Sequence, residues 1–245
     1  SGGGPVGIWA WDAKNAVIQH SISHSNLRGP TGVDGGGFDL DGGCRDSVVQ
    51  YCYAYDNAGY GYLFAHFADS RASVNNTFRY NLGQENEDGF GMWATNANGG
   101  GNGVYVYNNV IYQTSGNGIK WVPNTGNLHN VKFYNNLFIT ENAIHSGAQP
   151  TDGYYFSPTN LRVLPADALT LLTGSTIPEH LIEDAYAIDR LNSYRPLSTA
   201  TTITGAGDAI DSLENYYANI VDISDDEVAV PTSIGAYQYP SCPVC

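Results

Sequence analysis

The 245-residue sequence predicts an all-β protein of the right-handed parallel β-helix class, in which short strands stack coil upon coil. Three observations predict it: an internal repeat, short strands that open with glycine, and an unusual composition. The chain holds 29 Gly and 18 Tyr, and only 14% of its residues are charged, against about 25% in typical soluble domains. This profile suits a β-rich protein with glycine corners better than a helical one.

The repeat appears in five segments, VIQHSISHSN from Val17, VVQYCYAYDN from Val48, SVNNTFRYN from Ser73, VYNNVIYQT from Val106 and FYNNLFIT from Phe133. Aligning Gln19, Gln50, Asn75, Asn108 and Asn135 gives steps of 31, 25, 33 and 27 residues. One such unit cannot bury its apolar face alone, but stacked units can. We therefore expect coils about 4.8 Å apart, with these polar residues piled in a ladder.

A second family of strands lies between the repeats: GIWAW from Gly7, GFDLD from Gly37, GYLFAH from Gly61, GFGMWA from Gly89, GIKWV from Gly118 and, more weakly, NAIHS from Asn142. Side chains of a strand alternate between its two faces. If Ile8, Phe38, Phe90 and Ile119 point inward, then Trp9, Asp39, Gly91 and Lys120 point outward.

The repeat fades near residue 147, which divides the chain into coils over 1–146 and a capping, wrapping segment of the same domain over 147–245. Residues 165–172 predict a short helix that begins at Pro165, and DEVAVPTSIGAYQYP predicts an extended strand against the core. The end of a β-helix is an open sheet edge that needs a cover. The first coil looks uncapped, so an earlier segment or self-association is expected there.

Charge and cysteine usage narrow the partners and the compartment. A net charge of −14 disfavours nucleic acid and anionic lipid, and no apolar run approaches the roughly 20 residues of a membrane span. SGGGPVGIW lacks the features of a signal peptide. Disulfides among Cys44, Cys52, Cys242 and Cys245 are the preferred interpretation, with a metal knuckle or redox pair at the terminal CPVC as the alternative.

Several stretches resemble secreted right-handed parallel β-helix repeat proteins of the pectate-lyase-like superfold. They are GGGFDLDGGCRDSVVQYCYAYDNAGYGYLF at 35–64, NGVYVYNNVIY at 102–112, HNVKFYNNLFIT at 129–140 and the tail PTSIGAYQYP at 231–240. The resemblance implies this fold and an extracellular location. It does not choose among the polysaccharide lyases, glycoside hydrolases, epimerases and proteins without activity in that group.

DGGGFDLDGG at 34–43 is the strongest candidate for chemistry. Asp39 and Asp41 share one face of a strand about 6.5–7 Å apart, in the range of an inverting glycosidase pair. Two other interpretations stay open. Asp beside Gly commonly caps turns, and Asp34, Asp39 and Asp41 with glycine carbonyls supply many of the oxygens that calcium needs.

Other residues on the same predicted sheet extend the candidate site. His66 and Lys120 are the further catalytic candidates. Trp9, Trp93 and Trp121 are predicted platforms on which sugars stack, and His145 is predicted to bind substrate. No cofactor is required by this scheme, and calcium is the one metal considered.

Two functions from different classes follow. The first is an extracellular carbohydrate-active protein, a glycoside hydrolase or polysaccharide lyase, with a glycan as its partner. The low count of Lys and Arg argues against lyase action on heavily anionic substrates. The alternative is a non-catalytic structural or adhesive module that assembles into extracellular fibres or a surface layer, for which the Tyr and Gly content and the uncapped first coil speak.

Overall fold

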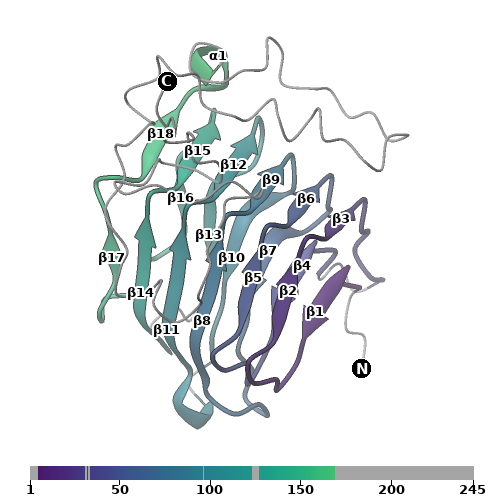
Figure 1. The fold of residues 1–245 in the computed structure, drawn as a ribbon, viewed down its shortest axis with the longest axis vertical. Coiled ribbons are helices and arrows are strands. Elements are labelled where there is room, and N and C mark those ends of the chain that lie inside the picture. The colour runs from purple at the N-terminus through teal and green to yellow at the C-terminus, as the bar shows by residue number, and fades with distance from the viewer. Residues whose placement is uncertain (1–4, 31, 33, 96, 123–126, 169–245) are drawn as a thin grey trace, which may run out of the picture.

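The computed structural model describes residues 5–30, 32, 34–95, 97–122 and 127–168, which form a parallel β-helix (Figure 1). Three six-stranded parallel sheets line its sides, and each coil contributes one strand to each sheet. Figure 1 shows the coils stacked from the N-terminal β1 at one end of the molecule to β18 at the other. The predicted fold class is therefore confirmed.

The first sheet, which we call sheet A, comes from the glycine-led strands. Its members are β1 (Ile8–Ala10), β4 (Phe38–Leu40), β7 (Tyr60–Phe64), β10 (Asp88–Met92), β13 (Ile119–Trp121) and β16 (His145–Ser146).

Sheets B and C come from the repeat segments, each of which supplies one strand to both. Sheet B holds β2 (Val17–Gln19), β5 (Val48–Gln50), β8 (Ser73–Arg79), β11 (Gly101–Tyr107), β14 (Leu128–Tyr134) and β17 (Tyr155–Phe156). Sheet C holds β3 (Ile22–His24), β6 (Tyr53–Tyr55), β9 (Leu82–Gln84), β12 (Val110–Gln113), β15 (Leu137–Thr140) and β18 (Leu161–Val163). The stack thus continues past residue 146, where the sequence analysis placed the start of the cap.

Helix is scarce in the described chain. A short 3₁₀ turn covers Ala97–Gly99, and α1 (Pro165–Ala168) begins at the predicted proline. The rest of the predicted helix, the predicted C-terminal strand and most of the capping segment lie outside the described residues. In the part of the chain that the structure describes, we find no helix long and apolar enough to cross a membrane.

The interior is filled by apolar side chains that repeat from coil to coil. On sheet A the inward residues Phe38, Tyr62 and Phe90 pair across neighbouring strands. The ring centroids of Phe38 and Tyr62 lie 5.6 Å apart, and those of Tyr62 and Phe90 lie 5.5 Å apart. The Tyr62 hydroxyl donates a hydrogen bond of 2.7 Å to the Leu82 carbonyl oxygen. A buried aromatic stack of this kind supplies both apolar area and a fixed register.

The predicted polar ladder exists, but its register was wrong. Gln50 pairs with Arg79, and Arg79 pairs with Tyr107, so neither Asn75 nor Asn108 shares the column of Gln50. What repeats is a left-handed residue at the corner between sheets B and C, at φ values of 51° to 54° for His20, Tyr51, Tyr80, Asn108 and Asn135. The residue type before that corner differs from coil to coil, which is why alignment by residue type failed; the paired residues are Gln19, Gln50, Arg79 and Tyr107.

In the last four coils the residue after the corner is a buried asparagine, and these residues form the actual ladder: Asn81, Asn109, Asn136 and Asn160. Asn109 Nδ2 donates to the Phe78 carbonyl oxygen at 3.0 Å and to Asn136 Oδ1 at 2.9 Å, while its own Oδ1 accepts the Asn81 backbone N–H at 3.0 Å. All four are buried. The ladder satisfies backbone groups that the turn would otherwise leave without partners.

We expect Asn109→Ala to lower the free energy of unfolding by about 3 kcal/mol, because it leaves several buried polar groups unsatisfied. Urea denaturation followed by circular dichroism would measure the loss. Asn102→Ala, at an exposed position of β11 that loses one exposed hydrogen bond from Asn130, serves as the control and should change stability by less than about 1 kcal/mol. Equal effects of the two variants would show that the ladder does not stabilise the coils.

The two described cysteines are not in disulfides. Cys44 and Cys52 are buried free thiols in the core, and burial raises the pKa of Cys44 to about 11 and that of Cys52 to about 12. The prediction of disulfides is therefore wrong for these two residues. Cys242 and Cys245 lie outside the described residues.

Candidate functional site

The outer face of sheet A carries the candidate site, as alternation predicted. Strand register places Trp9, Asp39, Leu63, Gly91 and Lys120 side by side on successive strands, and we call these five residues the outer row. A side chain on Gly91 would meet the Tyr60 ring at 2.6 Å, so the absence of a side chain there lets that ring lie over β10.

A second row follows two residues later along the same strands. The ladder continues there, because Asp41 N–H donates to the Ala10 oxygen, Trp93 N–H to the Phe64 oxygen and Val122 N–H to the Met92 oxygen, at 2.9, 3.0 and 3.0 Å. Trp11, Asp41, Ala65, Trp93 and Val122 make up this second row. Asp39 on β4 and Asp41 just after it thus lie on one face, beside Trp9 on β1 and Trp11 just after β1.

Asp39 is a buried carboxyl group on the outer row, with 3% of its surface exposed. Its Oδ1 atom has no hydrogen-bond partner in the described structure. Burial raises the pKa of Asp39 well above its usual range, and the negative charges of Asp41 and Asp34 raise it further. A carboxyl group in this setting holds its proton at neutral pH.

Asp41 is half-buried, and different parts of its surroundings shift its pKa in opposite directions. The Gly42 N–H donates to Asp41 Oδ1 at 2.8 Å, which favours the ionised form. Burial is the larger effect, and together with the charges of Asp34 and Asp69 it raises the pKa of Asp41 to about 6. That value is close to the pH at which general acids work best.

Asp34 lies on the segment between β3 and β4, and its side chain lines the cavity of the site. Its backbone is left-handed, with φ of 61°. Arg28 holds this segment in place, because its Nε donates to the Ala58 oxygen at 2.8 Å and its Nη1 to the Gly32 oxygen at 3.1 Å. The Nη2 of Arg28 forms an ion pair with Glu87. One guanidinium therefore ties the Asp34 segment to the next two coils.

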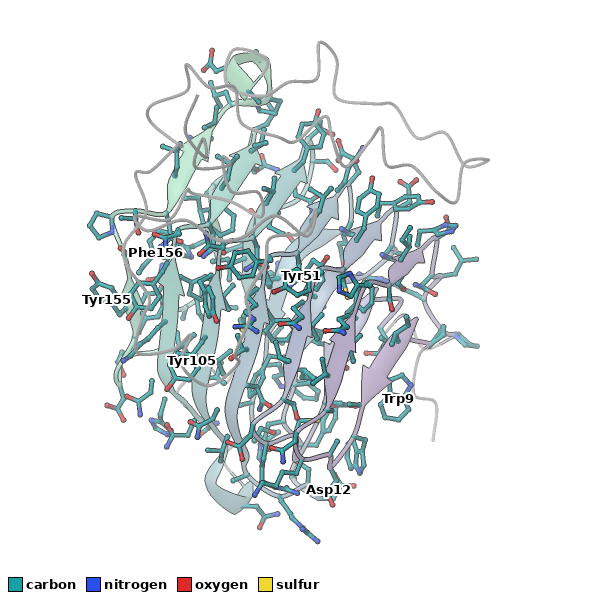
Figure 2. All side chains as sticks on the ribbon, viewed as in Figure 1. Trp9, Asp12, Tyr51, Tyr105, Tyr155 and Phe156 are labelled. Carbon is teal, nitrogen blue, oxygen red and sulfur yellow. The ribbon has the colours of Figure 1, made fainter. Side chains whose placement is uncertain are left out.

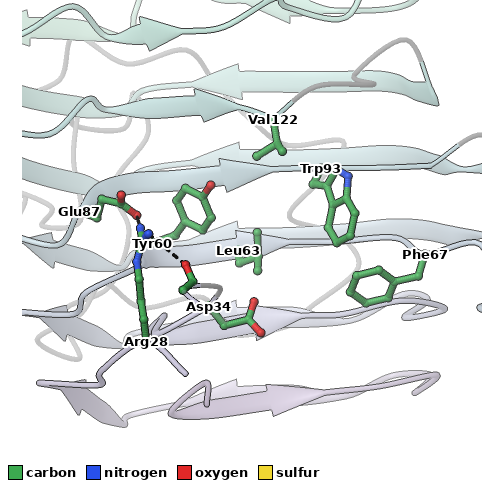
Figure 3. A pocket seen from close by; sticks show the side chains of 9 residues that line it. Arg28, Asp34, Tyr60, Leu63, Phe67, Glu87, Trp93 and Val122 are labelled. Carbon is green, nitrogen blue, oxygen red and sulfur yellow. Dashed lines mark hydrogen bonds and ion pairs between the residues drawn. The ribbon is translucent and has the colours of Figure 1, made fainter. Parts of the chain in front are cut away.

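The cavity has a volume of about 460 Å³ and opens on the outer face of sheet A. Figure 3 shows Leu63 at its centre, with Asp34 below it. Arg28, Glu87 and Tyr60 lie on one side, and Phe67 and Trp93 lie on the other. An apolar cavity with a few charged groups at its rim is the usual form of a small-molecule site.

Aromatic rings form the side of the cavity opposite the ion pair. The ring centroids of Phe67 and Trp93 are 4.7 Å apart in an edge-on arrangement. Phe67 also stacks on Trp11, with centroids 5.6 Å apart and planes 22° apart. Trp93 lies where the sequence predicted, at the site, and Trp9 is exposed beside Asp39.

Trp121 was predicted as a sugar platform, and the structure corrects this. It pairs with Met92 on the inward face and is 2% exposed. The reason is alternation, since Trp121 is two residues from the inward Ile119. His145 also differs from its prediction: it pairs with Ile119, accepts a 3.3 Å hydrogen bond from Trp121 Nε1, and lies at the end of the core instead of the cavity. Burial lowers the pKa of His145 to about 4.

None of the four predicted catalytic residues, Asp39, Asp41, His66 and Lys120, is among the residues that line the cavity. His66 is buried, does not line the cavity, and approaches the Thr95 hydroxyl at 3.4 Å through Nδ1; burial lowers its pKa. Lys120 is on the outer row, but three strand spacings separate it from Asp39, or about 14 Å. Its Nζ contacts Ser146 Oγ at 3.5 Å.

The calcium prediction finds no support in the geometry. Within residues 5–168, apart from the gaps in the description, no group of three or more His, Cys, Asp or Glu side chains is arranged to hold a metal ion. Asp34, Asp39 and Asp41 influence each other's charge without converging on one point.

Three residues at the site escaped the sequence analysis: Trp11, Phe67 and Arg28. Trp11 was within reach, because it is two residues from Trp9 and shares its face. Phe67 and Arg28 lie in loops, where no periodicity indicates the direction of a side chain. Asp34 was assigned to calcium, whereas the structure places it at the cavity wall.

The raised pKa values predict how stability depends on pH. Folded Asp39 and Asp41 bind protons more tightly than unfolded aspartate, whose pKa is about 4. The native state therefore carries more protons in this range, and stability falls as pH rises from about 4 through 6 and beyond. Asp39→Asn should flatten this fall and raise the melting temperature at pH 7.5. A melting curve series from pH 4 to 8 would test it, and an unchanged slope in the variant would contradict it.

Comparison with known proteins gives one similarity. No protein-family model matches the chain. A Lacto-N-biosidase of Bifidobacterium longum subsp. longum is 33% identical over 135 residues, which is 55% of this chain and 8% of the relative. The chain therefore spans less than a tenth of the length of that relative.

Proposed function

We propose that this chain carries the catalytic groove of an extracellular glycoside hydrolase that acts on neutral glycans. The observation that carries the proposal is a cavity with aromatic walls that is lined by Asp34, with Asp39 on the strand next to its lining residue Leu63 and Asp41 two residues further along the chain. Asp39 is buried with an unpartnered Oδ1, and Asp41 has a pKa raised to about 6. The similarity to a Lacto-N-biosidase supports the same class of reaction.

The roles follow from the environment of each carboxyl group. Glycosidases use one carboxylic acid to protonate the leaving oxygen, while a second carboxylate acts as base or nucleophile. Asp41, half-buried with its raised pKa, suits the proton donor. Asp34 lines the cavity and is the second carboxyl group. Asp39, neutral because it is buried, shares the outward face of Asp41 and is the proposed donor of a hydrogen bond to the substrate or to a neighbouring carboxylate.

The charge of the cavity favours hydrolysis of a neutral glycan over lyase action on a uronate. A lyase must neutralise the carboxylate of its substrate with cationic groups. Arg28, the one cation among the cavity-lining residues that the structure describes, is already paired with Glu87. Lys120 lies too far along the stack to serve a substrate held at Asp41.

A panel of glycans tests this proposal. We expect release of reducing ends from neutral glycans, with a nitrophenyl glycoside of lacto-N-biose as the first compound to try, and no absorbance of unsaturated uronates from polyuronates. The configuration of the first product, followed by NMR, would show whether the reaction inverts or retains. If the protein is shown to be folded and hydrolyses none of the neutral glycans, the proposal is refuted.

A second candidate is self-assembly through the first coil. Val17, Ile22 and Leu27 are exposed there, and β1, β2 and β3 form one edge of each sheet in the described chain. Open strand edges are templates for pairing with another chain. Sedimentation velocity over a range of concentrations would distinguish the two candidates, since self-assembly predicts larger species that Val17→Lys disperses.

A further inference from the structure

A line of aromatic rings extends beyond the cavity towards the first coil. Trp93 contacts Phe67, and Phe67 stacks on Trp11, so three rings follow one another without a gap. Trp93 and Phe67 line the cavity, but Trp11 lies outside it. Trp11 is 42% exposed, an unusual state for so large an apolar side chain.

The line of rings runs parallel to the stack, along the second row. Trp11 follows β1 and Trp93 follows β10, three strand spacings apart, or about 14 Å. Asp41 follows β4, which is the strand next to β1 on the way to β10. The carboxyl groups therefore lie beside the middle of the aromatic line, with rings on both sides of them. This length is more than one sugar ring can cover.

The chemistry of this surface suits a sugar chain. Ring faces bind the apolar C–H faces of pyranoses, and an indole offers a large, rigid surface for that purpose. The described rim opposite the rings presents an ion pair, Arg28 with Glu87, which has little net charge. An acidic glycan would be repelled by the carboxylates of Asp34 and Asp41 on this path, whereas a neutral glycan would not.

The exposure of Trp11 differs in its setting from that of Val17 and Ile22, which are also exposed on the first coil. Val17 and Ile22 belong to sheets B and C, on other sides of the helix. Trp11 alone of these three is in ring contact with a residue of the cavity wall. Continuity with the cavity, rather than exposure itself, assigns Trp11 to the ligand.

We propose that Trp11 and Phe67 extend the cavity into a binding platform for a neutral oligosaccharide that lies along the stack, with sugar units on both sides of Asp41. This inference rests on the proposed function, because it takes the aspartates as the point of cleavage. It adds a prediction that the proposed function alone does not make: the protein discriminates its substrates by chain length, through residues of the first coil.

Measurements of binding test the platform separately from catalysis. In Asp41→Asn protein, calorimetric titration with neutral oligosaccharides of increasing length should show affinity that rises with length. Trp11→Ala in the same background should weaken binding of the longer compounds by about tenfold, as expected for loss of an aromatic anchor. A single-sugar aryl glycoside should bind within about twofold of the parent.

Two matched variants control for folding. Trp11→Phe keeps a ring against Phe67 and should retain most of the affinity. Tyr155→Ala removes an aromatic side chain of similar exposure, 44% against 42%, at the opposite end of the stack from Trp9 and the first coil (Figure 2). It should leave binding unchanged.

The outcomes are separable. Equal losses for short and long glycans in Trp11→Ala, or no loss at all, would overturn the platform even if the protein hydrolyses glycans. Length-dependent binding that Trp11→Ala abolishes, in a protein that cleaves none of them, would keep the platform and refute the hydrolase.

Discussion

Asp41→Asn should lower kcat on a neutral oligosaccharide by about 10²- to 10⁴-fold, the usual contribution of a general acid. The amide keeps the shape of the side chain and its contact with the Gly42 N–H side of the turn, but it cannot supply a proton to the leaving oxygen. The KM should change little, because the groove is intact. Steady-state kinetics on purified variant, with folding checked by circular dichroism, measures the effect.

The pH dependence of activity is a second test of Asp41 as the general acid. A general acid must be protonated, so activity should fall as pH rises above about 6, the pKa of Asp41. This basic limb should vanish in Asp41→Asn. Nitrophenyl glycosides, whose leaving groups need little protonation, should lose much less activity than a natural glycan in the same variant.

Asp69→Asn is the matched control for this position. Asp69 is exposed, and its charge contributes to the raised pKa of Asp41. Its removal should move the basic limb to lower pH while kcat at the optimum stays within about twofold, since no proton donor is lost. If both variants retain full activity on natural glycans with an unmoved limb, Asp41 is not the acid.

Trp121→Ala should lower the free energy of unfolding by about 3–5 kcal/mol, as large-to-small changes of buried aromatic residues do. Trp121 fills the core between sheets, with its ring centroid 6.1 Å from that of Phe133 and 5.4 Å from that of Tyr154. The change also removes the Trp121 Nε1–H group, which donates a hydrogen bond to His145 Nδ1. Urea unfolding would measure the loss.

Trp93→Ala is the natural comparison, because both tryptophans were predicted as sugar platforms. Trp93 is partly exposed at the cavity, so its loss should cost less stability, about 1–2 kcal/mol, and should weaken glycan binding. If Trp121→Ala weakened glycan binding while stability stayed near that of wild type, the core position of Trp121 would be refuted.

Trp121 and Trp11 show how much of the side-chain direction on sheet A can be predicted from alternation along a strand. On sheet A, glycine precedes the inward residue in five of the six strands, and the inward direction of Ile8, Phe38, Phe90 and Ile119 was predictable from period-2 alternation. The same rule, applied two residues further, places Trp121 inside and Trp11 outside. Both facts were therefore contained in the sequence, and the prediction for Trp121 failed because it was not carried through.

The error in the predicted register of sheets B and C had a different cause. Aligning Gln50 with Asn75 and Asn108 treated similar polar residues as equivalent positions, but coils of unequal length shift them. The corner is set by backbone conformation, and Tyr51 and Tyr80 adopt the same left-handed φ as Asn108 and Asn135. Residue type alone does not report that conformation.

The sequence by itself determined the repeat, the parallel β-helix and the face on which Asp39 and Asp41 lie, because strand periodicity and stacking are local properties summed over many coils. Tertiary structure decided which carboxyl group is buried, which one lines the cavity, and that Arg28 ties the Asp34 segment to Glu87 two coils further on. These depend on how loops of different coils meet. The burial of each aspartate, and therefore its pKa, depends on these contacts between loops and not on any single strand.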